Sequence, residues 1–154
     1  MKNYMKLEIA AISENEGFAR SAVAAFALTL NPSLSELSDI KTAVSEAVTN
    51  CIVHAYKGKK TPENKILIEC KAEENENGGF LHIDVTDFGC GIENLDEAMQ
   101  PIFTTLSPNE RAGMGFTIMQ AFTTNFSATS AKGEGTTVSM VKKIGEEAKE
   151  RSDA

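Results

Sequence analysis

The stretch FLHIDVTDFGCG (residues 80–91) combines a β-strand pattern with a terminal acid and a glycine-rich turn. Side chains of a strand alternate between its two faces, which places Ile83 and Val85 on one face and their polar neighbours on the other. Asp87 shares the parity of Ile83 and Val85, so the pattern predicts an inward-facing carboxylate where the strand ends. A buried carboxylate needs hydrogen-bond donors. The amino group of adenine would be one, and a turn-capping role for Asp87 is the alternative.

The segments on either side of this strand predict an alternation of strands and helices. Further strands are expected at 5–9, 65–73, 125–131 and 136–143, and helices at about 13–30, 33–56 and 116–123. Asn77-Gly78-Gly79 indicates a hairpin, and the charged tail, 146–154, is expected to fray. We therefore expect one domain over residues 1–154 with an α+β fold. It should be a two-layer sandwich whose mixed, mostly antiparallel sheet carries helices on one face.

Both long helices open with a capping-box pattern, Ser13-x-x-Glu16 and Ser33-x-x-Glu36. In such a box the serine hydroxyl accepts from the glutamate N–H, and the glutamate carboxylate accepts from the serine N–H. The two patterns predict helix starts at these serines.

Glu46 and Asn50 lie one turn apart on the second long helix, away from its apolar stripe. Residues four apart sit one above the other on a helix surface. The stripe recurs at three- and four-residue spacing and comprises Leu37, Ile40, Val44, Ala47, Val48, Cys51 and Ala55. A solvated polar face is the ordinary explanation for the pair, and a functional site is the alternative.

The stretch from Gly89 to Gly115 has little periodicity and holds two glycine pairs, Gly89/Gly91 and Gly113/Gly115. Glycine permits close backbone approach, and a helix opening at the second pair would offer free N–H groups to phosphate oxygens. Ordinary turns would also explain both pairs.

Composition bounds the remaining classes of function. A net charge of −7 argues against a nucleic-acid-binding surface. No apolar run approaches the ~20 residues of a spanning helix, and no secretory leader is evident, so we expect a cytoplasmic protein without a membrane anchor. The three cysteines form no CxxC pair and are expected to be reduced. The chain carries neither a P-loop nor a dinucleotide-binding glycine fingerprint, which excludes the two common nucleotide folds.

Four motifs resemble, in order, the N, G1, G2 and G3 boxes of the ATP-binding family that includes gyrase, Hsp90, histidine kinases and MutL. The motifs are EAVTN (46–50), DFGCG (87–91), GMG (113–115) and GEGTT (133–137). The resemblance narrows to the anti-sigma serine kinases, most closely the sporulation anti-sigma F factors, through NCIVHAY (50–56), FTT (103–105) and RAGMGF (111–116). It covers nearly the whole chain and implies the Bergerat-type ATP-binding fold.

The resemblance also implies roles for residues that would contact the nucleotide. Asn50 would hold the Mg²⁺ that bridges the phosphates of ATP. Asp87 would accept a hydrogen bond from adenine N6, with Thr136 beside it through a water. Gly89 and Gly91 would let the backbone approach the nucleotide.

By the same resemblance, Gly113-Met114-Gly115 would cradle the phosphates at the base of a lid spanning roughly residues 95–112. Thr105 in this lid would contact the nucleotide, and Arg111 could reach the γ-phosphate. Glu46, one turn before Asn50, is placed to accept a proton from an attacking hydroxyl.

The implied function is twofold. The chain would bind a sigma factor of the sigma F type when ATP is bound, and it would phosphorylate a serine on a STAS-type anti-anti-sigma partner. The family forms homodimers, and the candidate surface is a helix face, for which core packing is the alternative. That face comprises Phe18, Ala22, Phe26 and Leu30.

Two other functions stay open on the residues alone. One is a nucleotide-gated binding module without meaningful phosphotransfer. The other is a detached histidine-kinase-like ATPase domain, although the chain has no separate phospho-acceptor helix, since His54 falls in the N-box helix and His82 in a strand.

Overall fold

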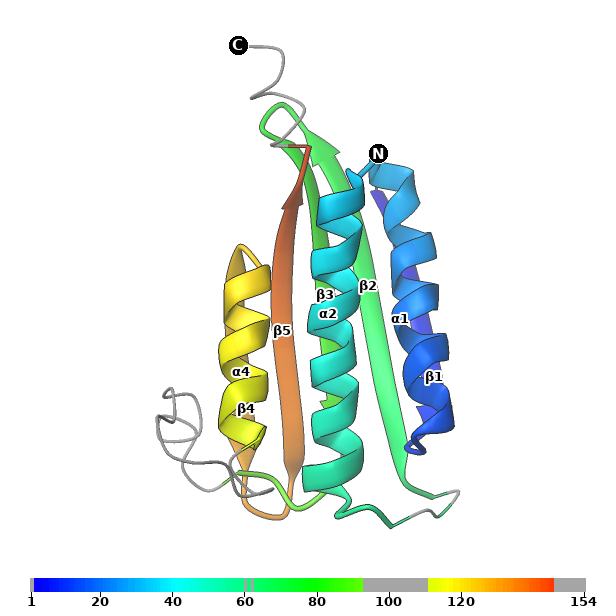
Figure 1. The fold of residues 1–154 in the computed structure, drawn as a ribbon, viewed down its shortest axis with the longest axis vertical. Coiled ribbons are helices and arrows are strands. Elements are labelled where there is room, and N and C mark those ends of the chain that lie inside the picture. The colour runs from blue at the N-terminus through cyan, green and yellow to red at the C-terminus, as the bar shows by residue number, and fades with distance from the viewer. Residues whose placement is uncertain (1, 60, 62, 93–110, 146–154) are drawn as a thin grey trace.

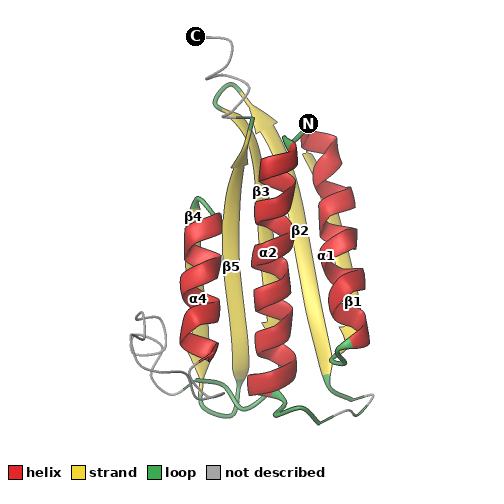
Figure 2. Cartoon of the chain, viewed as in Figure 1, coloured by secondary structure: helices red, strands yellow, loops and turns green. Residues whose placement is uncertain are grey.

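The computed structural model describes residues 2–59, 61, 63–92 and 111–145. Five strands form one sheet in the order β1-β2-β3-β5-β4. The strands are β1 (Lys2–Ala10), β2 (Lys65–Asn75), β3 (Gly78–Asp87), β4 (Asn125–Ala131) and β5 (Gly135–Ile144). The main helices, all on the same face of the sheet, are α1 (Glu14–Ala27), α2 (Leu34–Asn50) and α4 (Arg111–Phe122) (Figure 1). The predicted α+β two-layer sandwich is confirmed (Figure 2).

The sheet itself corrects one detail of the prediction. Each of the four strand pairings in the described chain is antiparallel, so the sheet is antiparallel and not mixed. The reason lies in the connections: α1 and α2 together carry the chain from β1 to β2, which then meet as antiparallel neighbours. Hairpins join β2 to β3 and β4 to β5.

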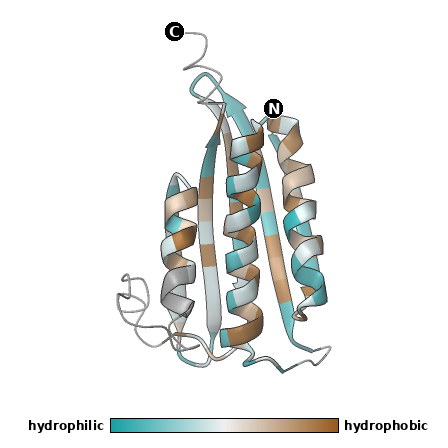
Figure 3. Cartoon of the chain, viewed as in Figure 1, coloured by the Kyte–Doolittle hydropathy of each residue, from teal (hydrophilic) through white to brown (hydrophobic). Residues whose placement is uncertain are grey.

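The core lies between the sheet and the three helices. Alternate residues of β2 and β3, together with one stripe of α2, contribute to it. Figure 3 shows hydrophobic segments alternating with hydrophilic ones along α2. Its fully buried side chains include Ile40, Val44, Val48, Ile66, Ile68, Leu81, Ile83 and Val85. Among the described residues, no helix combines the length and the apolar character needed to cross a bilayer.

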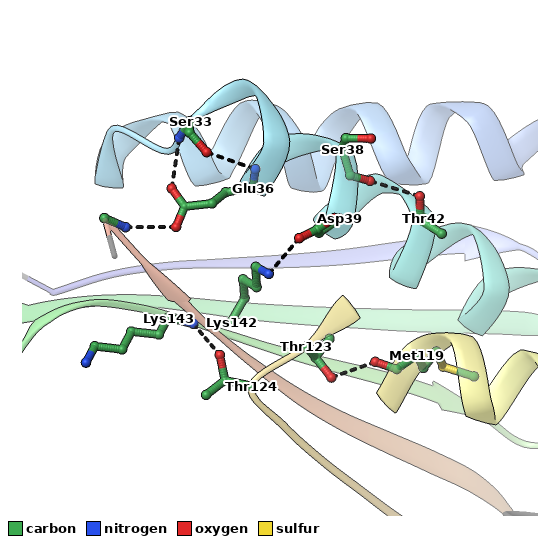
Figure 4. Close-up of polar contacts among 11 residues, drawn as sticks. Ser33, Glu36, Ser38, Asp39, Thr42, Met119, Thr123, Thr124, Lys142 and Lys143 are labelled. Atoms are coloured by element: carbon green, nitrogen blue, oxygen red, sulfur yellow. Dashed lines mark hydrogen bonds and ion pairs between the residues drawn. The ribbon is translucent and has the colours of Figure 1, made fainter. Parts of the chain in front are cut away.

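The capping box at Ser33 is confirmed and is part of a larger anchor. Ser33 Oγ accepts from Glu36 N at 3.0 Å, and Glu36 Oε1 accepts from Ser33 N at 2.9 Å. The second oxygen, Glu36 Oε2, accepts from Gly145 N at 2.9 Å, and Lys142 Nζ pairs with Asp39 Oδ2 at 2.9 Å (Figure 4). The start of α2 is thereby held to the end of β5.

The predicted capping box at Ser13 is wrong. Ser13 has helical backbone angles, φ −60° and ψ −29°, and its side chain makes no capping hydrogen bond. Glu16 is engaged elsewhere, because its Oε1 accepts from Ser45 on α2 and pairs with Arg20. Tertiary contacts have overridden the local pattern.

The proposed apolar face of α1 is divided in the structure. Leu30, in the short helix η1 (Leu28–Leu30) after α1, is buried, whereas Phe18 is 56% exposed. The residues of α1 that enter the core are Ala19, Val23, Ala24 and Ala27. Of the proposed face, Phe18 is therefore available for contact with another chain and Leu30 is not.

Candidate functional site

The candidate site lies at one end of the sandwich, where α2 and β3 end and β5 begins (Figure 1). A cavity at this end is lined by the end of α2, the turn that follows it, the end of β3 and the start of β5. Its lining comprises Ala47, Asn50, Cys51, His54, Ala55, Val85, Asp87, Cys90, Gly91, Ile92, Phe116, Thr136 and Val138. Four predicted contacts are thus brought to one cavity: Asn50, Asp87 and Thr136 from three elements, and Gly91 from the loop after β3.

Asp87 is the buried acid that strand parity predicted, with 5% of its surface exposed. Its Oδ1 accepts from Gly89 N at 3.0 Å and from Thr136 N at 3.3 Å. Burial raises the pKa of the Asp87 carboxyl, while hydrogen bonds from Gly89, Cys51 and Thr136 act in the opposite direction. The bond from Gly89 is the turn-capping contact, so Asp87 combines this local role with a position in the cavity wall.

Asn50 ends α2 and carries an unmatched polar atom. Its Nδ2 is buried and has no hydrogen-bond partner among the described residues. Directly after it the chain widens into a π-helical turn, η2 (Cys51–Ala55), a feature that is frequent at functional sites. A buried amide without a partner is costly, which marks Asn50 as a group available to a ligand.

Gly115 of α4 packs against this amide. A Cβ on Gly115 would lie 3.0 Å from both Nδ2 and Oδ1 of Asn50. The close approach brings the amide of α2 beside the second turn of α4. Mg²⁺ takes oxygen ligands, typically one or two from the protein with the rest from water and phosphates, and the Asn50 Oδ1 fits that requirement.

The glycines of the DFGCG loop are needed for packing within the protein. A Cβ on Gly89 would lie 2.4 Å from Ala55 O, and one on Gly91 would lie 2.0 Å from Ala131 O. Gly91 also has a φ of +73°, which L side chains rarely adopt. The loop is therefore clamped between η2 and the turn that joins β4 to β5, and its approach to a nucleotide stays a prediction.

Tyr56 anchors the same loop and was missed at the level of sequence. Its hydroxyl donates to Lys65 O at 2.6 Å and accepts from Phe88 N at 2.8 Å. Cys51 was predicted only as part of the apolar stripe of α2. In the structure its thiol also hydrogen-bonds to Asp87. Burial, followed by the nearby Asp87 charge, raises the pKa of Cys51. Neither contact has a local sequence signal.

Glu46 does not line this cavity. It borders a separate groove between α1 and α2, together with Arg20, Lys41 and Ser45. The distance along α2 to Asn50 is one helical turn, as predicted. Glu46 and Asn50 therefore border different hollows, although they lie one turn apart on α2.

The G2 box lies inside a helix that begins earlier than predicted. Since α4 starts at Arg111, Gly113 and Met114 belong to its first turn and Gly115 to its second. The predicted lid, 95–112, overlaps the described chain only at residues 111–112, which are helical. Thr105, the rest of the lid and the tail lie outside the described residues.

Comparison with known protein families identifies the class of protein to which this fold and cavity belong. Residues 9–142 match the family model described as the histidine kinase-like ATPase domain. The RsbU and RsbW domains of Rv1364c from Mycobacterium tuberculosis superpose with a TM-score of 0.62 at 15% identity, covering 92% of this chain and 32% of that one. That likeness concerns the fold.

Close relatives then specify the family. The chain is 52% identical to the anti-sigma F factor of Thermoanaerobacter sp. (strain X514), over 93% of this chain and 95% of that protein. It is 46% identical to the anti-sigma F factor of Oceanobacillus iheyensis, over 94% of each chain. The chain belongs to the anti-sigma F factor family, within the histidine kinase-like ATPases.

Proposed function

We propose that this protein binds Mg-ATP at the Asn50–Asp87 cavity, sequesters a sigma factor of the sigma F type in that state, and phosphorylates a serine of a STAS-type anti-anti-sigma partner. The observation that carries the proposal is one cavity whose wall holds both a buried carboxylate, Asp87, and the Asn50 amide, whose buried Nδ2 has no partner in the described part of the chain. Asp87 supplies a hydrogen-bond acceptor suited to a base, and Asn50 supplies a ligand suited to a metal ion bound to phosphates. All of this would take place in the cytoplasm.

The base would be read by Asp87. A carboxylate accepts hydrogen bonds and cannot donate them when ionised. Adenine offers an amino group at position 6, whereas guanine offers a carbonyl oxygen there. The charge of Asp87 therefore favours ATP over GTP at this contact.

The phosphates would lie toward the start of α4. The N–H groups at the start of a helix suit phosphate oxygens, and Asn50 Oδ1 would hold Mg²⁺, which would supply charge neutralisation on the phosphates when bound. Arg111 and Thr105 are assigned to the phosphate end by family resemblance. Positioning and charge neutralisation account for most of the rate of phosphoryl transfer.

Glu46 is the candidate base for the acceptor serine. In the transfer, the serine oxygen bonds to the γ-phosphorus of ATP. The bond between this phosphorus and the oxygen that bridges it to the β-phosphate breaks, ADP leaves, and the serine proton passes to the Glu46 carboxylate. The groove that Glu46 borders lies between α1 and α2, and it would admit the segment of the partner that carries the serine. A homodimer would use the exposed part of α1 around Phe18.

A second function is favoured by the same location of Glu46. Since this side chain does not line the cavity of Asn50 and Asp87, the protein could be a nucleotide-gated binding module in which ATP controls partner affinity without being used. Both functions require ATP at the cavity and differ only in transfer.

Single-turnover incubation with γ-labelled ATP, Mg²⁺ and the purified antagonist separates the two. We expect acid-stable label on the antagonist with the wild type and a loss of at least 100-fold in rate with Glu46→Gln. Glu69→Gln, on the exposed face of β2, is the matched control. An antagonist that stays unlabelled, with nucleotide-dependent binding intact, would establish the binding module, and acid-labile label would indicate histidine chemistry.

A further inference from the structure

Three inward-facing polar side chains form one row across the sheet at the cavity. Ser130 of β4 is paired with Thr136 of β5, and Thr136 is paired with Asp87 of β3. Thr136 lies in the cavity wall beside Asp87, while Ser130 lies behind it. Nothing in the local sequence around Ser130 indicates a site.

The hydrogen bonds of Ser130 use its full capacity. Its Oγ donates to Gly135 O at 2.9 Å, a carbonyl that can only accept. It accepts from Ile92 N at 2.7 Å and lies 2.7 Å from Thr136 Oγ1. A hydroxyl has one proton and two lone pairs, so with its proton on Gly135 O, Ser130 must be the acceptor in its bond with Thr136.

This assignment determines the polarity of Thr136. Because the Thr136 hydroxyl proton points to Ser130, only its lone pairs are left for the cavity. Asp87, its neighbour in the row, is also an acceptor. The edge of the cavity formed by Thr136 and Asp87 therefore offers acceptors alone, either to a base directly or to a water between them.

We propose that Ser130 is a positioning residue for base selection, which holds the Thr136 hydroxyl as an acceptor so that the cavity takes a 6-aminopurine and rejects a 6-oxopurine. The inference rests on the proposed binding of ATP at this cavity. Without Ser130, the Thr136 hydroxyl is free to rotate and to donate to a carbonyl oxygen at position 6. Selectivity would then fall even though Ser130 never touches the nucleotide.

A purely structural role for Ser130 predicts a different result. Its bond to Ile92 N also anchors the chain just after Gly91, and loss of that anchor would weaken all purine nucleotides alike. The ratio of affinities therefore distinguishes the two roles, whereas the affinity for ATP alone does not.

The test compares ATP with ITP, which differs from ATP only in carrying an oxo group and an N1 proton in place of the 6-amino group. Dissociation constants for both Mg complexes are measured on the full chain for the wild type, Ser130→Ala, Ser130→Thr, Thr136→Val and the double variant Ser130→Ala/Thr136→Val. Ser127→Ala, on the same strand and exposed on the other face, is the matched control. Should Ser130→Ala not fold, Ser130→Cys takes its place because a thiol is a weak donor and acceptor.

We expect Ser130→Ala to reduce the preference for ATP over ITP by roughly tenfold, the scale of one hydrogen bond. Ser130→Thr and Ser127→Ala should keep the preference. In the Thr136→Val background, Ser130→Ala should change the ratio no further, since the effect passes through the Thr136 hydroxyl.

Two results would overturn the inference. If the wild type prefers ATP and Ser130→Ala retains the whole preference, Ser130 plays no part in selection while the proposed function stands. If Ser130→Ala lowers the ratio equally with and without the Thr136 hydroxyl, the path through Thr136 is wrong. A wild type that binds neither nucleotide would instead refute the proposed function itself.

Discussion

The side-chain amide of Asn50 lies so close to Gly115 that a methyl group on Gly115 would lie 3.0 Å from both polar atoms of the amide. The contact joins the end of α2 to the second turn of α4, and these helices carry the N and G2 boxes. Any group that displaces the amide would disturb ligand binding without touching the core.

Gly115→Ala is the direct test of this contact. Alanine favours a helix interior by about 1 kcal/mol over glycine, so the free energy of unfolding should stay equal or rise. The added methyl group should push the Asn50 amide aside and weaken Mg-ATP by about tenfold or more. Calorimetric titration and urea denaturation measure the two effects, and unchanged ATP affinity would show that the amide is not a ligand.

Asn50→Ala should abolish Mg-ATP binding and leave the fold intact. Its Nδ2 has no partner in the described chain, so the truncation breaks no bond to that atom. The melting temperature without nucleotide should therefore match the wild type, while the increase caused by Mg-ATP should disappear. Thr49→Ala, the exposed neighbour on α2, serves as the control. A collapsed far-ultraviolet circular dichroism spectrum for Asn50→Ala would contradict this expectation.

Asp87→Asn should weaken ATP and reduce its advantage over GTP. Loss of a bond to a charged acceptor is worth about 1.5–3 kcal/mol, or roughly 10- to 100-fold in affinity. Asp84→Asn, on the opposite face of β3, should have no such effect. An equal preference for ATP over GTP in the wild type and in Asp87→Asn would show that Asp87 does not contact adenine.

Acidification should act through the same carboxyl group. Burial raises the folded-state pKa of Asp87 above the ordinary value of 3.8, so the acceptor is lost at a higher pH than for an exposed aspartate. ATP affinity should fall as the pH is lowered toward that raised pKa, and this pH dependence should vanish in Asp87→Asn.

The free energy of unfolding should depend on pH in the opposite direction. A raised folded-state pKa of Asp87 stabilises the folded protein below pH 3.8, and this stabilisation is lost as the pH rises through the folded-state pKa. Asp87→Asn should therefore not lower the melting temperature at pH 7.

Gly135 and Gly133 offer a matched pair for the turn between β4 and β5. Both have positive φ, +85° and +80°, but a Cβ on Gly135 would lie 2.2 Å from Asp87 O, whereas one on Gly133 would meet nothing within 4 Å. Gly133→Ala should cost only the left-handed conformation, about 1–2 kcal/mol. Gly135→Ala should cost clearly more and should displace Asp87. Equal urea midpoints for the two variants would mean that the turn can relax around the added methyl group.

The three thiols should differ in reactivity. Cys90 is exposed beside the cavity, whereas Cys51 and Cys70 are buried. Burial raises the pKa of Cys70 to about 12 and that of Cys51 well above its usual value, so both stay protonated at pH 8. A thiol reagent should modify Cys90 first, and Mg-ATP should slow the reaction; mass spectrometry identifies the site. Modification of Cys51 in the folded protein would contradict the structure.

Sequence alone determined the features that depend on local periodicity. Alternation in β3 placed Asp87 inside, the Ser33 box gave the start of α2, and the order of four glycine and acid motifs identified the family. The first two follow from strand parity and from hydrogen bonds between residues three apart, which are properties of short segments, and the third follows from resemblance along the chain.

Only the tertiary structure decided which distant groups meet. Ser13 does not cap α1, since Glu16 bonds instead to a residue of α2, and Phe18 is exposed because α1 buries Val23 and three alanines instead. Tyr56 and Ser130 join the site through strand register and contacts across 32 and 6 residues. The physical reason is that a hydrogen bond or close packing depends on position in three dimensions, whereas a sequence pattern reports only which face of its own element a residue occupies.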